Sequence, residues 1–205
     1  YFTSGDEPCV FELKGTKISL VICEDLWFSE PVLQAQQEGA EIIVAPNASP
    51  FNVEKHEERV AHLQERIKET GLPIVYVNHV GGQDELVFDG HSLVLDKEGN
   101  VKHELPRFVE AIRMIQFQDF EPQDEELLEP EPDEKAIYDA LVLSVQDYVT
   151  KNGFSGVVLG LSGGIDSALT LAVAVDALGP DKVQAVMMPF RYTSSMSVED
   201  AKEQA

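Results

Sequence analysis

The run Ser-Gly-Gly-Ile-Asp-Ser at residues 162–167 constrains the fold of this 205-residue chain more than any other feature. It follows a short apolar run, residues 157–159, and precedes a helical pattern of apolar residues that begins at Ala168. Glycines at such a turn let the backbone approach a ligand closely, and the unpaired N–H groups at a helix start favour an anion. We therefore predict a glycine-rich strand-to-helix turn that binds phosphate.

Two familiar phosphate-binding motifs do not explain this turn. No Gly-Lys-Ser/Thr follows at the Walker spacing, and the Gly-x-Gly-x-x-Gly dinucleotide pattern is missing here. An ordinary Gly-Ser turn that caps a helix remains the alternative explanation.

The longer run GLSGGIDS, residues 160–167, resembles the PP-loop of the N-type ATP pyrophosphatase family. The resemblance implies that ATP is split to AMP and pyrophosphate while an acyl oxygen is adenylated. By it, the ATP-binding residues are Gly160, Leu161, Ser162, Gly163, Gly164, Ile165, Asp166 and Ser167. Asp166 is the candidate Mg²⁺ ligand, because a hard cation that bridges phosphates prefers carboxylate oxygen. The alternative role of Asp166 is to complement the helix dipole.

Composition excludes several classes of partner. The formal net charge of −22 argues against nucleic acid, which is bound through a basic footprint. No apolar run approaches the roughly 20 residues of a membrane span, and the first residues show no signal-peptide pattern, so we expect a cytoplasmic protein without a membrane partner. Cys9 and Cys23 are too few for a disulfide framework, and no CxxC or His/Cys cluster indicates zinc.

The order of apolar runs predicts an α/β fold for residues 1–117. Strand-like runs occur at 17–23, 41–46 and 73–80, with helix-like stretches at 31–39 and 53–70 between them. Two more strand-like segments, 91–95 and 100–104, and a further run at 108–117 follow. These elements together predict an α/β sandwich with mixed strands.

Residues 118–134 predict a linker or surface strap between two domains. From Asp119 to Glu134 there are nine acids, no base and three prolines. After it, a helix at 135–152, a strand at 156–161, the glycine-rich turn, a second helix and a strand at 182–188 predict the start of a Rossmann-like parallel sheet. Because the first residue is not Met and the turn lies near the C-terminus, we expect a fragment of a longer protein, with domains 1–117 and 135–205.

Cys23 lies at the end of the first apolar run and is followed by Glu24. A thiol there is either a buried structural cysteine or a nucleophile whose oxyanion the next backbone N–H groups receive. The segments GTKISLVICEDLWFSEP, AEIIVAPNASPF and VYVNHVGGQDELVFDGHS resemble the nitrilase-fold amidase family, in which a Glu-Lys-Cys triad cleaves amides. The resemblance implies that Cys23 is the nucleophile and that the N–H of Glu24 helps to hold the oxyanion.

By the same resemblance, the triad lysine and glutamate lie upstream of residue 1, so this chain alone is expected to be inactive as an amidase. Ser49 and Lys55 resemble the positions that bind the amino-acid end of glutamine; the alternatives are a turn or cap for Ser49 and a solvated helix face for Lys55. Glu57, Glu58 and Arg59 are expected to be exposed charges. The five histidines show no common spacing and receive no role.

The pairing of a nitrilase-like domain with a PP-loop domain resembles the family of glutamine-dependent NAD⁺ synthetases. It implies that deamido-NAD⁺, ATP, glutamine and water give NAD⁺, AMP, pyrophosphate and glutamate, with Mg²⁺ as cofactor and a closed passage for ammonia. The implied partners are small molecules, and the full-length protein is expected to be a homo-oligomer. The segment MMPFRYTSSMS resembles a further family segment, with Tyr192, Met188 and Arg191 as weaker candidates for adenylate contacts.

Two other classes of function remain open. One is a different ATP-pyrophosphatase amidotransferase, or a carbon–nitrogen hydrolase with another acceptor. The other is a non-catalytic nucleotide-binding module.

Overall fold

The computed structural model describes residue 5, residues 7–124 and residues 127–205, which form two units. The first unit runs up to Val80 and resumes at Phe88–Pro132, and the second contains Gly81–Val87 and Asp133–Ala205. None of the helices in the described part of the chain combines the length and apolar character that crossing a membrane requires.

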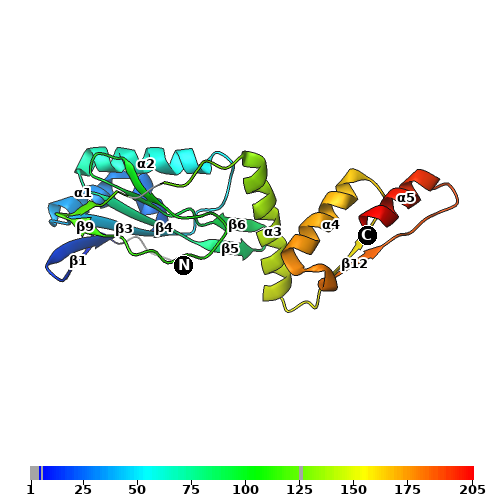
Figure 1. Cartoon of the computed structure of the whole chain (residues 1–205). Coiled ribbons are helices and arrows are strands. Elements are labelled where there is room, and N and C mark those ends of the chain that lie inside the picture. The colour runs from blue at the N-terminus through cyan, green and yellow to red at the C-terminus, as the bar shows by residue number, and fades with distance from the viewer. Residues whose placement is uncertain (1–4, 6, 125–126) are drawn as a thin grey trace. The chain divides into compact units, whose positions relative to one another are not determined.

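A mixed six-stranded sheet in the order β1-β2-β3-β4-β7-β8 forms the first unit (Figure 1). Its strands are β1 (Cys9–Leu13), β2 (Thr16–Leu20), β3 (Ile42–Asn47), β4 (Ile74–Asn78), β7 (Leu93–Leu95) and β8 (Val101–Glu104). The central strands β2, β3 and β4 are parallel, whereas β1, β7 and β8 pair antiparallel with their neighbours. Lys14 and Gly15 join β1 to β2 with positive φ angles, as a two-residue hairpin turn requires.

Two helices cover one face of this sheet, α1 (Ser29–Gln37) and α2 (Lys55–Thr70) (Figure 1). Side chains that alternate along the strands meet the helices in the core, which contains Val21, Leu26, Val32, Ile43, Ala45, Leu63, Ile67, Ile74, Tyr76, Leu93 and Leu95. Gly71 ends α2 in the left-handed conformation at φ 66°, and its N–H donates to the Ile67 carbonyl. The predicted α/β sandwich with mixed strands is confirmed.

Some predicted bounds need correction. The first run forms a strand only as far as Leu20, and Cys23 instead begins a short 3₁₀ helix, η1 (Cys23–Trp27). The further apolar run at 108–117 forms strand structure only at its last residue, Phe117, where β9 begins. Residues 109–116 lie in none of the described strands, and the side chain of Ile112 is 100% exposed.

The sequence pattern did not predict two β-hairpins. One joins β5 (Val80–Gln83) to β6 (Leu86–Asp89), and the other joins β9 (Phe117–Gln118) to β10 (Glu121–Pro122). The second hairpin occupies the first residues of the acidic segment. Glu125 and Glu126 of that segment, like residues 1–4 and Asp6, lie outside the described residues.

The second unit is built on a parallel pair of strands, β11 (Val157–Gly160) and β12 (Val183–Val186). Its helices are α3 (Asp133–Lys151), α4 (Ile165–Leu178), the short η2 (Pro180–Lys182) and α5 (Ser195–Gln204). Helix α3 also binds the Gly82 peptide within this unit: Asp147 Oδ2 accepts its N–H at 2.7 Å and Lys151 Nζ donates to its carbonyl at 2.8 Å. A Cβ at Gly82 would lie 3.3 Å from the Ser144 Cα, so the close approach depends on glycine.

Candidate functional site

The polar residues of the first unit gather at the carboxyl ends of its three parallel strands. Cys23 follows β2, Ser49 follows β3, and Asn78 ends β4. The strands are in register, with Leu20 opposite Val44 and Asn47 opposite Asn78. Ligands bind at the carboxyl ends of strands in open α/β sheets, so this edge is the candidate site of the first unit.

Cys23 occupies a strained backbone position beside a fixed turn. Its φ is 48°, in the left-handed region, and its side chain is partly exposed as a free thiol. Asp25 holds the turn, since its carboxylate accepts the Ile22 N–H at 2.7 Å while its own N–H donates to the Ile22 carbonyl at 3.0 Å. The thiol is therefore placed on a defined turn rather than in the core.

Ser49 and Lys55 line one narrow cavity, together with Leu26, Trp27, Glu58, Arg59, His62, Leu63 and Tyr76. Its volume is about 20 Å³, which is room for about one water molecule. Lys55 Nζ lies 2.7 Å from Glu58 Oε2 and 5.4 Å from the centre of the Trp27 ring. The structure thus brings together the two residues that the sequence assigned to the amino-acid end of a ligand.

Arg59 was expected to be an exposed charge, and this expectation is wrong. Its side chain is buried at 5% exposure and forms a two-pronged ion pair with Asp89, itself 2% exposed, at 2.9 Å for each bond. Burial is affordable because the charges neutralise each other and the remaining N–H groups find acceptors. The signal was present in the helical spacing, since Arg59 precedes the buried Leu63 by four residues and Ile67 by eight.

A second polar cluster joins His56, His91 and Glu104, whose ligand atoms lie within 4.8 Å of one another. Burial is the main cause that lowers the pKa of His56 to about 4, so this ring is neutral near pH 7. Arg107 Nε donates to His91 Nδ1 at 3.0 Å, which leaves His91 Nε2 as the N–H that donates to Glu104. That nitrogen has no lone pair for a metal ion, so this arrangement is a hydrogen-bond network. The sequence did not predict this cluster, because positions 56, 91 and 104 are far apart and form no recognisable spacing motif.

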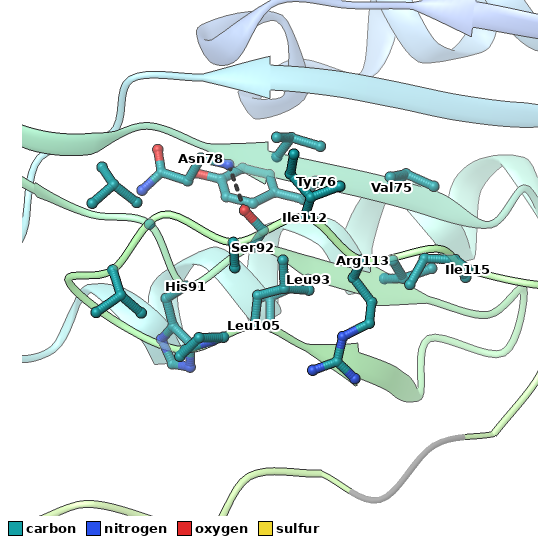
Figure 2. A pocket seen from close by; sticks show the side chains of 17 residues that line it. Val75, Tyr76, Asn78, His91, Ser92, Leu93, Leu105, Ile112, Arg113 and Ile115 are labelled. Carbon is teal, nitrogen blue, oxygen red and sulfur yellow. Dashed lines mark hydrogen bonds between the residues drawn. The ribbon is translucent and has the colours of Figure 1, made fainter.

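A larger cavity, of about 270 Å³, contains none of the residues that the sequence singled out. Figure 2 shows its mostly apolar lining, from Val75 and Leu93 to Ile112 and Ile115. Ser92 Oγ accepts the Asn78 N–H there at 3.0 Å, the dashed line in Figure 2. Ser49 and Lys55 therefore line the smaller cavity, whereas Cys23 is not among the residues that line either cavity.

The glycine-rich turn of the second unit joins β11 to α4. Gly163 has φ +80°, and a Cβ there would lie 2.2 Å from the Ser197 carbonyl oxygen of α5, so only glycine fits. Hydrogen bonds close the turn on itself: Ser162 N–H donates to Ser167 Oγ at 3.2 Å, and Ser167 Oγ donates to the Gly164 carbonyl at 2.9 Å. Gly164 caps α4 in an extended conformation. A preformed loop thus presents the start of a helix.

The remaining candidates surround this loop. Asp166 is exposed in the first turn of α4, and Leu161 is buried, with its N–H bonded to the Val186 carbonyl at 2.9 Å. Met188 Cε lies 3.2 Å from the Cβ position of Gly160. The Arg191 guanidinium lies 4.9 Å from the Tyr192 ring centre, and that tyrosine is 79% exposed.

Fold and site together define a nitrilase-like α/β unit with a thiol at a strand end, followed by a unit with a PP-loop-like turn. Residues 1–122 match the family model of carbon-nitrogen hydrolases, and the chain belongs to this family. Residues 137–205 match the model of NAD synthase.

Known relatives contain both parts. Glutamine-dependent NAD⁺ synthetases from Acinetobacter baylyi and Xylella fastidiosa are 49% and 50% identical, over 100% and 96% of this chain. The solved structure of glutamine-dependent NAD⁺ synthetase from Acinetobacter baumannii, in complex with adenosine diphosphate, matches with a TM-score of 0.93 and 46% identity. The match covers 99% of this chain and 39% of the chain in that solved structure. The chain spans 38% and 37% of the length of the two curated relatives.

Proposed function

We propose that this chain is part of an enzyme that makes NAD⁺ from deamido-NAD⁺, with glutamine as the nitrogen donor and ATP as the activating substrate. The observation that carries the proposal is the coexistence, in one chain, of a strand-end thiol with an amino-acid cavity and of a glycine-rich nucleotide turn. The relatives named above share both halves.

In the first half, Cys23 is the nucleophile that attacks the side-chain amide of glutamine. Attack forms a C–S bond and, after collapse of the tetrahedral oxyanion, releases ammonia; water then releases glutamate and restores the thiol. The N–H of Glu24, in the first turn of η1, helps to hold the oxyanion. Ser49 and Lys55 bind the amino-acid end of the substrate.

In the second half, residues 160–167 bind ATP. The N–H groups at the start of α4 and the Ser162 hydroxyl are donors for the phosphate oxygens, while Ser167 holds the turn closed. The deamido-NAD⁺ carboxylate attacks the α-phosphorus, pyrophosphate leaves, and ammonia displaces AMP from the acyl-adenylate. A passage that excludes bulk water carries ammonia from the first reaction to the second. The enzyme works in the cytoplasm, where these small-molecule substrates occur, and the full-length protein assembles as a homo-oligomer.

The donor set at the turn fits Mg²⁺. Asp166 offers an exposed carboxylate beside the phosphate-binding N–H groups, and the hard cation prefers such oxygen. Bound Mg²⁺ would neutralise charge on the phosphates. Asp166 would hold the cation, and the Ser162 hydroxyl would orient the phosphates.

The test compares ammonia with glutamine as nitrogen source in the full-length protein, with deamido-NAD⁺ and ATP supplied. Formation of NAD⁺ from both sources, with one AMP for each NAD⁺, is the expected result. Hydrolysis of glutamine without any NAD⁺ would indicate another acceptor. Absence of both hydrolysis and ATP turnover would favour a binding module.

A further inference from the structure

The hairpin of β5 and β6 belongs to both units of the chain. Val80 and residues 88–89 are part of the first unit, whereas Gly81–Val87 are part of the second. At the base of the hairpin, the Gly90 N–H donates to the His79 carbonyl at 2.8 Å. The hairpin therefore starts and ends in one unit and has its middle in the other.

The base of the hairpin is built into the buried network of the first unit. Asn78, which ends β4, donates from its side chain to Asp89 Oδ1 at 3.3 Å and to the Ser49 carbonyl at 3.2 Å. Its amide oxygen accepts the Ser49 N–H at 2.9 Å. Asp89, the last residue of β6, pairs with Arg59, whose Nη2 donates to the Ser49 carbonyl at 2.9 Å. The two residues that flank the hairpin thus hold the loop after β3, at the sheet edge where Cys23 also lies.

The middle of the hairpin is held by an ion pair on α3. The Gly82 N–H donates to Asp147 Oδ2 at 2.7 Å, and Lys151 Nζ donates to the Gly82 carbonyl at 2.8 Å. Lys151 Nζ also lies 2.7 Å from Asp147 Oδ2, so the peptide and the two charges close a ring of bonds. Hydrogen bonds with one ionised partner are stronger than neutral ones. Because the Asp147 side chain is only 19% exposed, salt and water screen this ring less than a pair on an open helix face.

Gly82 permits this grip, and it lies close to the base of the hairpin along the chain. A Cβ at Gly82 would lie 3.2 Å from the Asp147 Cβ and 3.3 Å from the Ser144 Cα, so a side chain would push the hairpin and the helix apart. At most about 13 Å of extended chain separates Gly82 from Asn78. Closely packed interiors transmit strain rather than absorb it, so a shift of Gly82 reaches Asn78 and Asp89.

We propose that Asp147 and Lys151 are positioning residues for the hydrolysis of glutamine. By holding Gly82 they keep the hairpin, and through it the loop after β3, in the arrangement in which Cys23 reacts. Both residues lie within the range 137–205 that matches the NAD synthase model, so a helix of the synthetase half serves the amidase half. The inference rests on the proposed function, because it takes glutamine hydrolysis as the reaction of the first unit.

Three substitutions on α3 separate the grip on Gly82 from the helix itself. Asp147→Ala breaks the ring and removes the acceptor of the Gly82 N–H. Asp147→Asn is the conservative variant, because a side-chain amide still accepts that N–H but no longer carries the charge that pairs with Lys151. Asp139→Ala is the matched control, since Asp139 lies earlier on the same helix and pairs with Lys135 at 2.6 Å, also at a spacing of four residues.

The experiment measures two rates in the full-length protein, glutamate formed from glutamine and NAD⁺ formed from ammonia. Asp147→Ala should lower kcat/KM for glutamine hydrolysis by about 10-fold, the effect expected when a charge-assisted hydrogen bond that positions a site is lost. Synthesis from ammonia should change by less than about 2-fold, because ammonia bypasses the amidase site. Asp147→Asn should lose less than Asp147→Ala, and Asp139→Ala should match the wild type in both rates. If Asp147→Ala does not fold, Asp147→Asn carries the comparison.

Gly82→Ala tests the same contact from the side of the hairpin. If the hairpin carries the effect, Gly82→Ala also lowers glutamine hydrolysis, and Asp147→Ala adds little to it. Unchanged hydrolysis, an equal loss of synthesis from ammonia, additive effects in the double variant, or the same loss in Asp139→Ala would overturn the inference. Glutamine hydrolysis with no NAD⁺ formation in the wild type would contradict only the proposed function, because glutamate release still compares the variants. Absence of hydrolysis in the wild type would overturn both.

Discussion

The two candidate sites of this chain are built in opposite ways. In the first unit, Ser49 is 7% exposed and is held by Arg59, Asn78 and Asp89, all of which are buried. In the second unit, the turn at 160–167 is mostly exposed, with Ile165 at 80%, and its hydrogen bonds are local. An amino-acid end group needs a few fixed, desolvated partners, whereas a phosphate is served by consecutive backbone N–H groups at a helix start. The difference follows from the size and charge of what each site is proposed to bind.

The largest expected effect breaks the first site alone. Cys23→Ala in the full-length protein should abolish glutamine-dependent NAD⁺ synthesis, by at least about 10³-fold, because alanine cannot form the covalent intermediate. Synthesis from ammonia should persist, since it bypasses the thiol. Both activities are measured as NAD⁺ formed. Equal loss of both would show that Cys23 is a structural residue.

Breaking the second site should give the converse pattern. Asp166→Asn removes a carboxylate proposed to hold Mg²⁺, so synthesis from either nitrogen source should fall on the order of 100-fold. Glutamine hydrolysis, assayed as glutamate formed, should continue. A raised requirement for Mg²⁺ would sharpen the assignment, and unchanged synthesis would rule out the metal role.

The contrast between the sites also explains what the sequence could predict. The PP-loop-like turn is eight consecutive residues, so its fold and role are visible in one window, and Cys23 was expected at the end of a strand. The residues that fix Ser49 come from α2, β4 and β6, and nothing local links positions 59, 78 and 89. Arg59 was misjudged because a charged residue on a helix is usually solvated; only its register with Leu63 and Ile67 revealed the buried face.

The apolar run at 108–117 adds no strand to the six-stranded sheet, also because the sequence does not show long-range partners. Strand propensity predicts extended backbone but not a partner, and a strand is stable only when its N–H and carbonyl groups pair. The hairpin turns were missed because several non-glycine residues there take positive φ, among them Asp84 at 51° and Asp119 at 53°. Composition alone does not reveal which non-glycine residue takes a positive φ, a backbone conformation that is unfavourable for it.

A smaller effect concerns stability and belongs to the first unit only. The pKa of His56 is lowered from 6.5 to about 4 in the folded protein. Between these pH values His56 is therefore mostly protonated in the unfolded chain and mostly neutral in the folded chain. Stability should therefore fall as the pH drops from about 6.5 toward 4, by at most about 3 kcal/mol and less after screening at the partly exposed ring. Arg107 and Arg59 add positive charge nearby, and Glu104 opposes them.

The test compares melting temperatures of the wild type and His56→Gln in the full-length protein from pH 7 to 5. The wild type should lose stability more steeply, because glutamine does not titrate. Glu104 does not confuse this window: its pKa is lowered from 4.5, so the stability it contributes is lost only at lower pH. Parallel curves for the two proteins would show that His56 is not held neutral by the fold.

The smallest expected effect concerns the acidic segment from Asp119 to Glu134. Its first residues form the β9–β10 hairpin and are tied to the first unit by ion pairs of Lys97 with Glu121 and of Lys102 with Asp124, each at 2.6 Å. Asp124 is nevertheless 83% exposed, and exposed pairs of this kind contribute little. Replacing Asp124, Glu125 and Glu126 with Gln should change the free energy of unfolding by only a few tenths of a kcal/mol and leave synthesis intact.

Two measurements check this prediction, thermal unfolding of the triple variant and limited proteolysis of the native protein. The apolar side chains near the three sites are half exposed, with Leu127 at 44% and Leu128 at 42%, so the segment lacks a buried anchor there and should be cut readily. A solvated strap carrying nine acids also loses like-charge repulsion when three are neutralised, which offsets the loss of the Lys102 pair. A large fall in melting temperature, or resistance to protease across residues 123–132, would show that the segment is packed structure and that the boundary between the two regions lies elsewhere.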